Sequence, residues 1–135
     1  MGLNNKITSF DPNGMGDLSG NIYGLPFDTD DARLVILPVP WEVTVSYQSG
    51  TAAAPEAVLA ASYQVDLYDP FVKDAWKLGI AMMDMNQGIL ERNQALRPKA
   101  EKYIIQMEQG INPMNNVTMQ DALDEINLAC LELNQ

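Results

Sequence analysis

The sequence predicts an α/β fold with a mainly parallel sheet, and two kinds of segment support this prediction. The runs at 33–40 and 78–83 are short and apolar, and polar or turn-forming residues flank them. Such runs are typical of strands that are covered on both faces. Segments 52–62, 98–109 and 118–133 have the composition or the apolar spacing of helices. Because doubly covered strands occur mainly in parallel sheets between helices, we expect a layered α/β domain.

Composition divides the chain into an arm and a domain. Residues 1–32 are rich in Gly, Asn, Asp and Pro, which predicts an irregular N-terminal arm. Residues 33–135 carry the expected strands and helices. A hydrophobic content of 47% is enough for a packed core.

The first expected strand leads into a loop and a helix. Pro38 and Pro40 end the strand, and the loop 41–51 leaves its carboxyl end, where open α/β sheets bind their ligands. The helix over 52–62 has Pro55 in its first turn and Glu56 near its N-terminal dipole, both favourable positions. This β-loop-α unit is the expected organising feature.

The next segments are expected to extend the sheet and its helix layer. Residues 64–70 alternate between polar and apolar, as an edge strand or an extended segment would. Segment 78–83 is a second candidate for a buried strand. A helix over 98–109 would end before Gly110, and residues 90–96 are candidates to extend it through a kink before Pro98.

The last expected helix is amphipathic. It opens with Thr118 and Asp121, which resemble a capping box. Its apolar face carries Ala122, Leu123, Ile126, Cys130 and Leu133.

Charge and composition exclude several classes of partner. The 18 acidic and 8 basic residues give a net charge of −10, which disfavours nucleic acid and anionic membrane surfaces. No apolar run approaches the roughly 18 to 20 residues that span a bilayer, and the first ten residues show no signal-peptide pattern. Cys130 is the only cysteine, so no internal disulfide forms. We therefore expect a soluble, cytoplasmic protein.

The absence of histidine limits the chemistry that the chain can perform. Zero histidines exclude Ser-His-Asp and Cys-His nucleophilic schemes. Asp28, Asp30 and Asp31 have the spacing of calcium ligands, but the loop glycine and the closing glutamate are missing. We interpret this cluster as a solvated acidic loop.

The stretch 34–69 carries a resemblance to a known family. It reads LVILPVPWEVTVSYQSGTAAAPEAVLAASYQVDLYD and resembles the first β-loop-α unit of the ureohydrolases, the arginase and agmatinase family. The loop sequence PWEVTVSY is similar to that of agmatinase-like and formimidoylglutamase-like members. The positions that fall on the family pattern are Pro40, Glu42, Gly50, Pro55 and Val58.

Three positions depart from the family pattern. Ala54 replaces the usual glycine, Leu59 an arginine, and Glu42 stands where aspartate is common. Weaker similarity extends the resemblance over most of residues 22–135.

The resemblance implies the N-terminal part of a three-layer αβα arginase-like fold, truncated before the metal-binding strands. In the full-length family, two manganese (or nickel) ions activate a hydroxide that attacks a guanidino or amidine carbon. None of the family's metal-binding motifs occurs here, since Asp74-Ala75 and Asp121-Ala122 are not followed by histidine. We therefore expect no catalytic and no metal-ligating residue in this chain, and no activity from it alone.

The loop holds the candidate substrate residues. By the resemblance, Glu42 would offer a carboxylate to a cationic guanidinium, while Thr44, Ser46 and Tyr47 would offer hydrogen bonds; Gly50 and Thr51 complete the candidate set. The alternative is structural: Glu42 caps neighbouring backbone groups, and Gly50 permits a turn with positive φ.

Two classes of function follow. The first is the N-terminal portion of a ureohydrolase, whose partner is the remaining catalytic segment or a complementary subunit. In its full-length form such an enzyme is expected to be a homo-oligomer, a trimer or hexamer, with the arm at an intersubunit contact. The alternative is a non-catalytic interaction or assembly protein that retained the ureohydrolase N-terminal unit.

Overall fold

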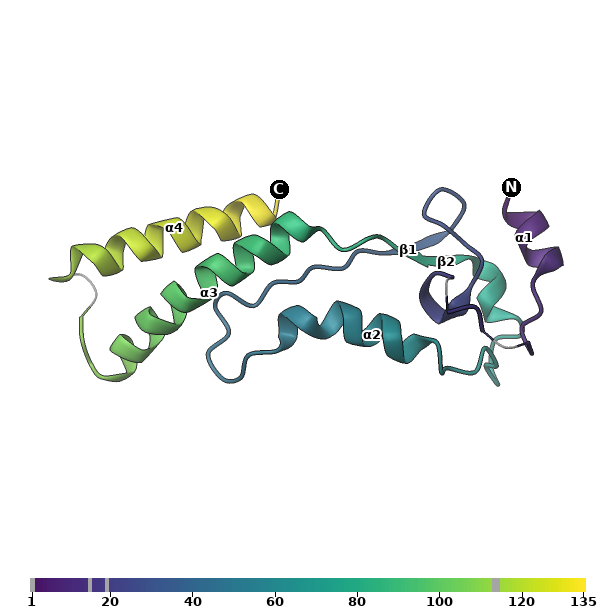
Figure 1. Cartoon of the computed structure of the whole chain (residues 1–135), viewed down its shortest axis with the longest axis horizontal. Helices are drawn as coiled ribbons and strands as arrows, with labels where there is room; N and C mark the ends of the chain where they lie inside the picture. The colour runs from purple at the N-terminus through teal and green to yellow at the C-terminus, as the bar shows by residue number, and fades with distance from the viewer. Residues whose placement is uncertain (1, 15, 19, 113–114) are drawn as a thin grey trace. The chain divides into compact units, whose positions relative to one another are not determined.

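The computed structural model describes residues 2–14, 16–18, 20–112 and 115–135 (Figure 1). The chain forms two compact units. Unit 1 consists of Met1–Pro38 and Ala54–Met85, and unit 2 consists of Val39–Ala53 and Asn86–Gln135. None of the described helices is long and apolar enough to cross a bilayer.

Unit 1 contains the sheet. Strands β1 (Leu34–Ile36) and β2 (Ile80–Met82) pair in parallel, with Leu34 opposite Ile80. The prediction of an α/β fold with a parallel sheet is therefore confirmed, although both strands are shorter than the apolar runs that predicted them.

The first strand is not covered on both faces, and that prediction is wrong for β1. Leu34 and Val35 are each 44% exposed, and Leu37 is 66% exposed. Burial is found at β2 instead, where Ala81 has no exposed surface. The 3-10 helix η1 (Ile22–Gly24) lies beside β2, which explains the difference between the two strands.

The N-terminal segment contributes regular structure and core residues. Helix α1 (Leu3–Ser9) places Leu3 and Ile7 on one face. They pack against a cluster formed by Leu25, Phe27 and Trp76. Part of the segment 1–32, which was expected to be an irregular arm, is therefore helical, and its residues Leu3 and Ile7 pack with Trp76 far along the chain.

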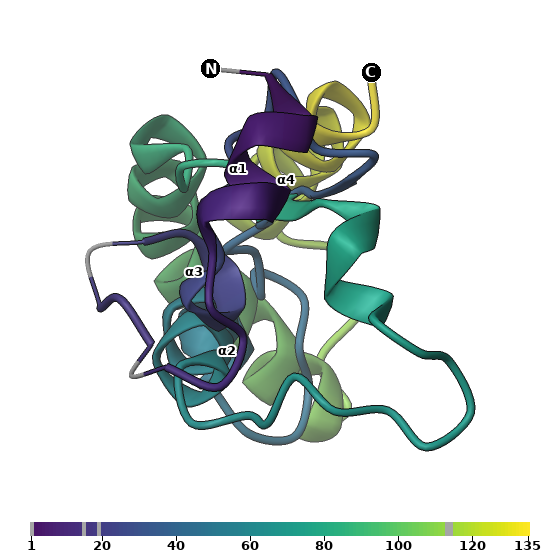
Figure 2. The same ribbon diagram turned by 90° about the vertical axis from the view of Figure 1, so that its right-hand side faces the viewer.

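Helix α2 (Ala54–Ser62) confirms the expected helix after the loop, with the 3-10 helix η2 (Thr51–Ala53) directly before it. Within unit 1, α2 lies beside η1, and the Ser62 hydroxyl accepts a hydrogen bond from the Tyr23 N–H at 2.9 Å. Residues 64–70 form no strand but belong to the irregular loop before the 3-10 helix η3 (Ala75–Leu78) (Figure 2). Asp69 makes a turn there by accepting from the Phe71 N–H at 2.7 Å.

Unit 2 is built on two long helices that run antiparallel (Figure 1). Helix α3 (Gln87–Glu108) packs along α4 (Val117–Leu133). Residues 90–96 and 98–109 thus belong largely to one helix, which continues through Pro98. The core of this unit consists of Val43, Leu96, Ala100, Ile126 and Ala129.

The ends of these helices follow local sequence rules. The Gly110 N–H donates to the Met107 carbonyl at 2.9 Å, and the Ile111 N–H donates to the Gln106 carbonyl at 3.0 Å. With a φ of 76° at Gly110, this is a Schellman ending, and the helix ends before Gly110 as predicted. The N-cap of α4 is Asn116, which accepts from the Met119 N–H at 3.3 Å. The expected opening at Thr118 is wrong, since Thr118 already lies inside the helix.

Candidate functional site

The loop between β1 and α2 is anchored in unit 2 by an apolar side chain. Val43 has no exposed surface and packs with Leu96 of α3 and Ile126 of α4. Trp41 packs against the same core. The loop therefore starts from a fixed point on the helix pair.

A buried carboxylate closes the loop. Glu42 is 9% exposed, and its Oε2 accepts hydrogen bonds from the Gly50 N–H at 2.6 Å and from the Ala52 N–H at 3.1 Å. Gly50 has a φ of 134°, a conformation that glycine adopts without the strain a side chain would add. One side chain thus ties the start of the loop to its end.

These bonds change the acidity of the carboxyl group. The backbone N–H groups of Ala52 and Gly50 stabilise the charged form and lower the pKa of Glu42, and the nearby Arg97 guanidinium adds to this effect. Glu42 is therefore an ionised structural group. The interpretation that it caps neighbouring backbone is confirmed, because its Oε2 is already bound to the protein's own amides.

Two polar residues of helix α3, Asn93 and Arg97, form hydrogen bonds with the backbone at the start of the loop. The Arg97 Nη1 donates to the carbonyl of Val43 at 3.1 Å and also to the carbonyl of Val45. Asn93 is 4% exposed, and its Oδ1 accepts from the Glu42 N–H at 2.6 Å. Asn93 and Arg97 are four residues apart, so they project from one face of the helix.

Neither Asn93 nor Arg97 was among the candidates from the sequence. The signal that could have found them is the spacing of Asn93, Leu96, Arg97 and Ala100, which puts two polar groups on the apolar face of α3.

The remaining candidates point outward. Thr44, Ser46, Tyr47 and Thr51 are exposed, and Tyr47 is 92% exposed. The anchored backbone therefore presents hydroxyl groups at the surface of unit 2. These groups can donate or accept hydrogen bonds, but none is placed as a nucleophile beside a general base in the part of the chain that the structure describes.

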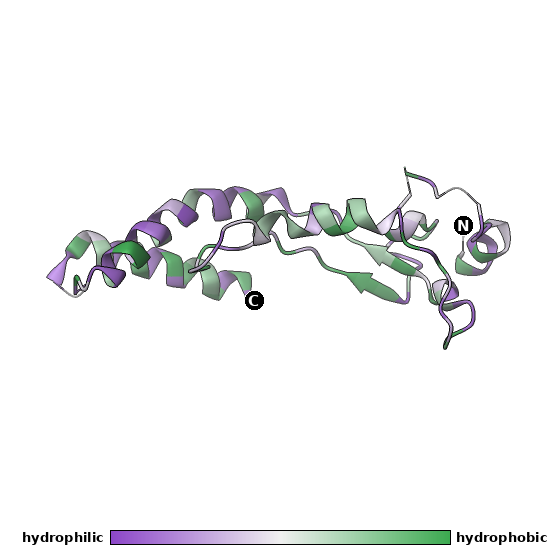
Figure 3. Ribbon diagram, turned by 90° about the horizontal axis from the view of Figure 1, so that it is seen from below, coloured by the Kyte–Doolittle hydropathy of each residue, from purple (hydrophilic) through white to green (hydrophobic). Residues whose placement is uncertain are grey.

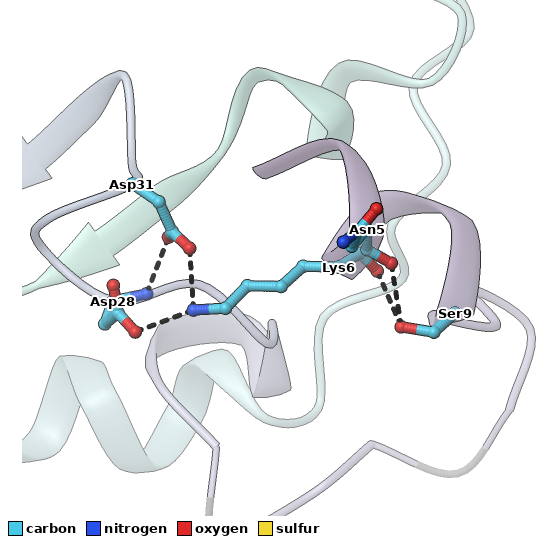
Figure 4. Close-up of polar contacts among 5 residues, drawn as sticks. All are labelled: Asn5, Lys6, Ser9, Asp28 and Asp31. Carbon is cyan, nitrogen blue, oxygen red and sulfur yellow. Dashed lines mark hydrogen bonds and ion pairs between the residues drawn. The ribbon is translucent and has the colours of Figure 1, made fainter. Parts of the chain in front are cut away.

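The acidic cluster of unit 1 is paired with a lysine from α1 (Figure 4). The Lys6 Nζ lies 2.6 Å from an Asp28 oxygen and 2.7 Å from an Asp31 oxygen. The hydrogen bonds that Lys6 donates to Asp28 and Asp31 raise the pKa of Lys6, and Lys6 in turn lowers the pKa of Asp28. The cluster is thus not purely a solvated loop, because the ammonium group neutralises part of its charge.

The donor groups present do not fit a binuclear metal site. Across the described ranges, no three side chains of the His, Cys, Asp or Glu type gather as a metal would require. Asp74, one of the two Asp-Ala sequences noted above, forms an ion pair with Lys77 at 2.8 Å.

One segment of this α/β chain is similar to a known hydrolase. Over 39 residues it is 51% identical to the N(1)-aminopropylagmatine ureohydrolase of Synechocystis sp.. The match covers 29% of this chain and only 13% of the Synechocystis protein. No family model and no solved structure matches the chain. The similarity suggests an origin among the ureohydrolases and supports no finer assignment.

We expect Glu42→Gln to destabilise unit 2 by about 1–3 kcal/mol at pH 7, because an amide replaces a charged acceptor of two backbone N–H groups. The folded-state pKa is lowered, so the stabilisation is present above the ordinary glutamate pKa, about 4.3, and is lost as pH falls through the folded-state pKa. The difference between the two proteins should therefore shrink in acid.

Urea denaturation at several pH values, followed by Trp41 fluorescence in a Trp76→Phe background, measures this difference. The matched control is Glu101→Gln, at an exposed position of α3. A pH-independent difference, or an equal loss in the control, would show that the carboxylate does not hold the loop.

The ion pairs Lys6–Asp28 and Lys77–Asp74 of unit 1 should respond independently when one lysine is replaced. Lys6→Met should raise the pKa of Asp28 and leave that of Asp74 alone, because Lys6 and Lys77 each lower the pKa of their own partner. Lys77→Met should raise the pKa of Asp74 and leave that of Asp28 alone. Carboxyl carbon NMR titrations give both pKa values, and an Asp28 pKa unmoved by Lys6→Met would refute the pairing.

Proposed function

We propose that this chain supplies the N-terminal β-loop-α portion of a binuclear-metal ureohydrolase that hydrolyses a guanidino or amidine C–N bond. Its loop 41–51 would line the substrate entrance, and the catalytic metal ligands would come from another segment. The observation that carries the proposal is the 51% identity over 39 residues to a ureohydrolase. The chain covers 13% of that protein, so the whole enzyme's reaction is proposed here and not transferred.

The geometry of the loop supports a role in positioning substrate. Glu42 and Arg97 hold the backbone of the loop, so less of the loop has to be ordered when the exposed hydroxyl groups of Thr44, Ser46 and Tyr47 bind a ligand. Preorganised polar groups lose less entropy on binding. In this proposal Glu42 shapes the loop, and the hydroxyl groups make the hydrogen bonds to a substrate.

The metal chemistry belongs to the complementary segment. Two metal ions bound there would supply a hydroxide nucleophile near neutral pH. The chain has no histidine, and its described residues form no metal-ligating group. Its contribution is therefore limited to the loop and the scaffold that holds it.

A chimera tests the proposal. Residues 34–69, which carry the resemblance to the family, replace the corresponding β-loop-α unit of the Synechocystis enzyme, and urea release from N(1)-aminopropylagmatine is measured with manganese. We expect activity, and we expect Thr44→Val with Ser46→Ala to raise KM because hydrogen bonds to the substrate are lost. Gln64→Ala, an exposed position outside the loop, is the matched control.

The chain alone, supplied with manganese, should release no urea from agmatine or arginine, since its sequence has no histidine and its described residues gather no metal-ligating group. A folded but inactive chimera, or loop variants with the same KM as the control, would contradict the proposal. In the first case, the non-catalytic interaction protein would remain as the alternative function.

A further inference from the structure

The helix pair of unit 2 holds a cavity of about 300 Å³. Tyr103 and Gln106 of α3 and Met119 and Ala122 of α4 are among the residues that line it. Residues three or four apart lie on one face of a helix, so the cavity lies between one face of α3 and one face of α4. Both helices carry hydrophobic and hydrophilic residues along their length (Figure 3). A volume of this size is at the lower end of the range of small-molecule sites, about 300–1,000 Å³.

Gln106 brings a buried acceptor without a partner to this cavity. In the part of the chain that the structure describes, its Oε1 atom is buried and accepts no hydrogen bond. The buried side chains of Glu42 and Asn93 differ, because each accepts hydrogen bonds from backbone N–H groups. Buried polar groups in folded proteins nearly always have a partner. An unpaired acceptor in the wall of a cavity therefore indicates that a donor group occupies the cavity.

The neighbours of Gln106 favour an aromatic occupant. Met119 is 4% exposed, and Tyr103 and Ala122 are half-buried. A thioether makes favourable contacts with the edge of an aromatic ring. A tyrosine ring packs favourably against a second ring in a tilted or offset arrangement. Met119 and Tyr103 thus provide the contacts that an aromatic body would make.

The charged side chains of the lining balance one another. Lys99 and Lys102 lie opposite in charge to Asp121 and Glu125. The Lys99 Nζ donates to both carboxylate oxygens of Glu125, at 2.7 and 2.5 Å. Because the lining has no net charge, it offers little to offset the hydration that a charged ligand would lose. A neutral ligand is therefore favoured.

We infer that this cavity is a binding site for a small neutral aromatic molecule with one O–H or N–H donor, which donates to the Gln106 Oε1. The ring lies against Met119 and Tyr103. A water molecule is the competing occupant, since a polar atom in a cavity of this size can bind one. The inference goes beyond the proposed function, because no residue of the loop 41–51, all of which the structure describes, lines the cavity.

Matched pairs of ligands test the inference. Phenol and indole carry the donor, whereas anisole and 1-methylindole have a methyl group in place of the donor hydrogen. NMR titrations of the full 135-residue chain, followed at the Met119 methyl group and the Gln106 side-chain amide, give the dissociation constants. We expect phenol and indole to bind about tenfold more tightly than their methylated partners, because only they satisfy the acceptor.

Substitutions in the two helices locate the site. Gln106→Met keeps the length of the side chain and removes the acceptor, so it should abolish the preference for phenol over anisole. The matched control is Gln109→Met, at an exposed position that caps the same helix, and it should keep the preference. Ala122→Leu fills part of the cavity and should weaken the binding of both ligands.

Thermal unfolding gives a second measurement that needs no ligand. Gln106→Met should leave the melting temperature unchanged or raise it, because an unpaired buried acceptor is replaced by an apolar group. A clear fall in the melting temperature, beyond that of Gln109→Met, would show that the acceptor has a partner and would overturn the inference.

Three titration results would also overturn it. These are the absence of saturable shifts at Met119 and Gln106, equal affinities for phenol and anisole in the parent chain, and a preference that survives in Gln106→Met. Equal affinities would show that a water molecule already satisfies the acceptor. Urea release by the chimera is a separate measurement, so the proposed function can fail or hold independently of this site.

Discussion

The structure of the candidate site depends on the Glu42 carboxylate and the two backbone amides that it binds. Glu42 follows Pro40 and precedes the fully buried Val43, so its side chain is held at the edge of an apolar core. An ionised group in such a place is stable only when its oxygens are bound, and the Gly50 and Ala52 amides meet that need. The loop takes its closed shape from this requirement. Arg97 then holds the first part of the loop by donating hydrogen bonds to the carbonyl groups of Val43 and Val45.

Local patterns in the sequence predicted the elements, and contacts distant in the sequence decided how they pack. The apolar run before Pro38, the turn-forming loop and the alanine-rich helix with Pro55 each follow a local rule, and each was found. For Glu42 the sequence left two roles open, because only the position of the Gly50 and Ala52 amides separates them. Arg97 contacts Val43, 54 residues earlier in the chain, and no local rule could predict that contact.

In the sheet, too, the sequence predicted the strands but not the contacts that decide which edge is covered. The composition of residues 34–36 and 80–82 predicted strands, and the parallel pairing follows from the α/β pattern. Doubly covered strands were expected because apolar runs normally lie between helix layers, yet β1 remains exposed in this chain. Asn21 closes β2 with an amide that lies 61 residues away in the sequence. A glycine- and asparagine-rich segment indicates only a turn, so this pairing could not be read from composition.

The most direct test of the account is amide hydrogen exchange at Gly50 and Ala52, measured by NMR in the full chain. If the Glu42 carboxylate closes the loop, both amides should exchange at least about tenfold more slowly than in an unstructured peptide, although Gly50 is exposed. Glu42→Gln should bring both rates close to the peptide rate while the α3 amides stay protected. Exchange at the peptide rate in the unaltered protein would contradict the claim that this carboxylate organises the loop.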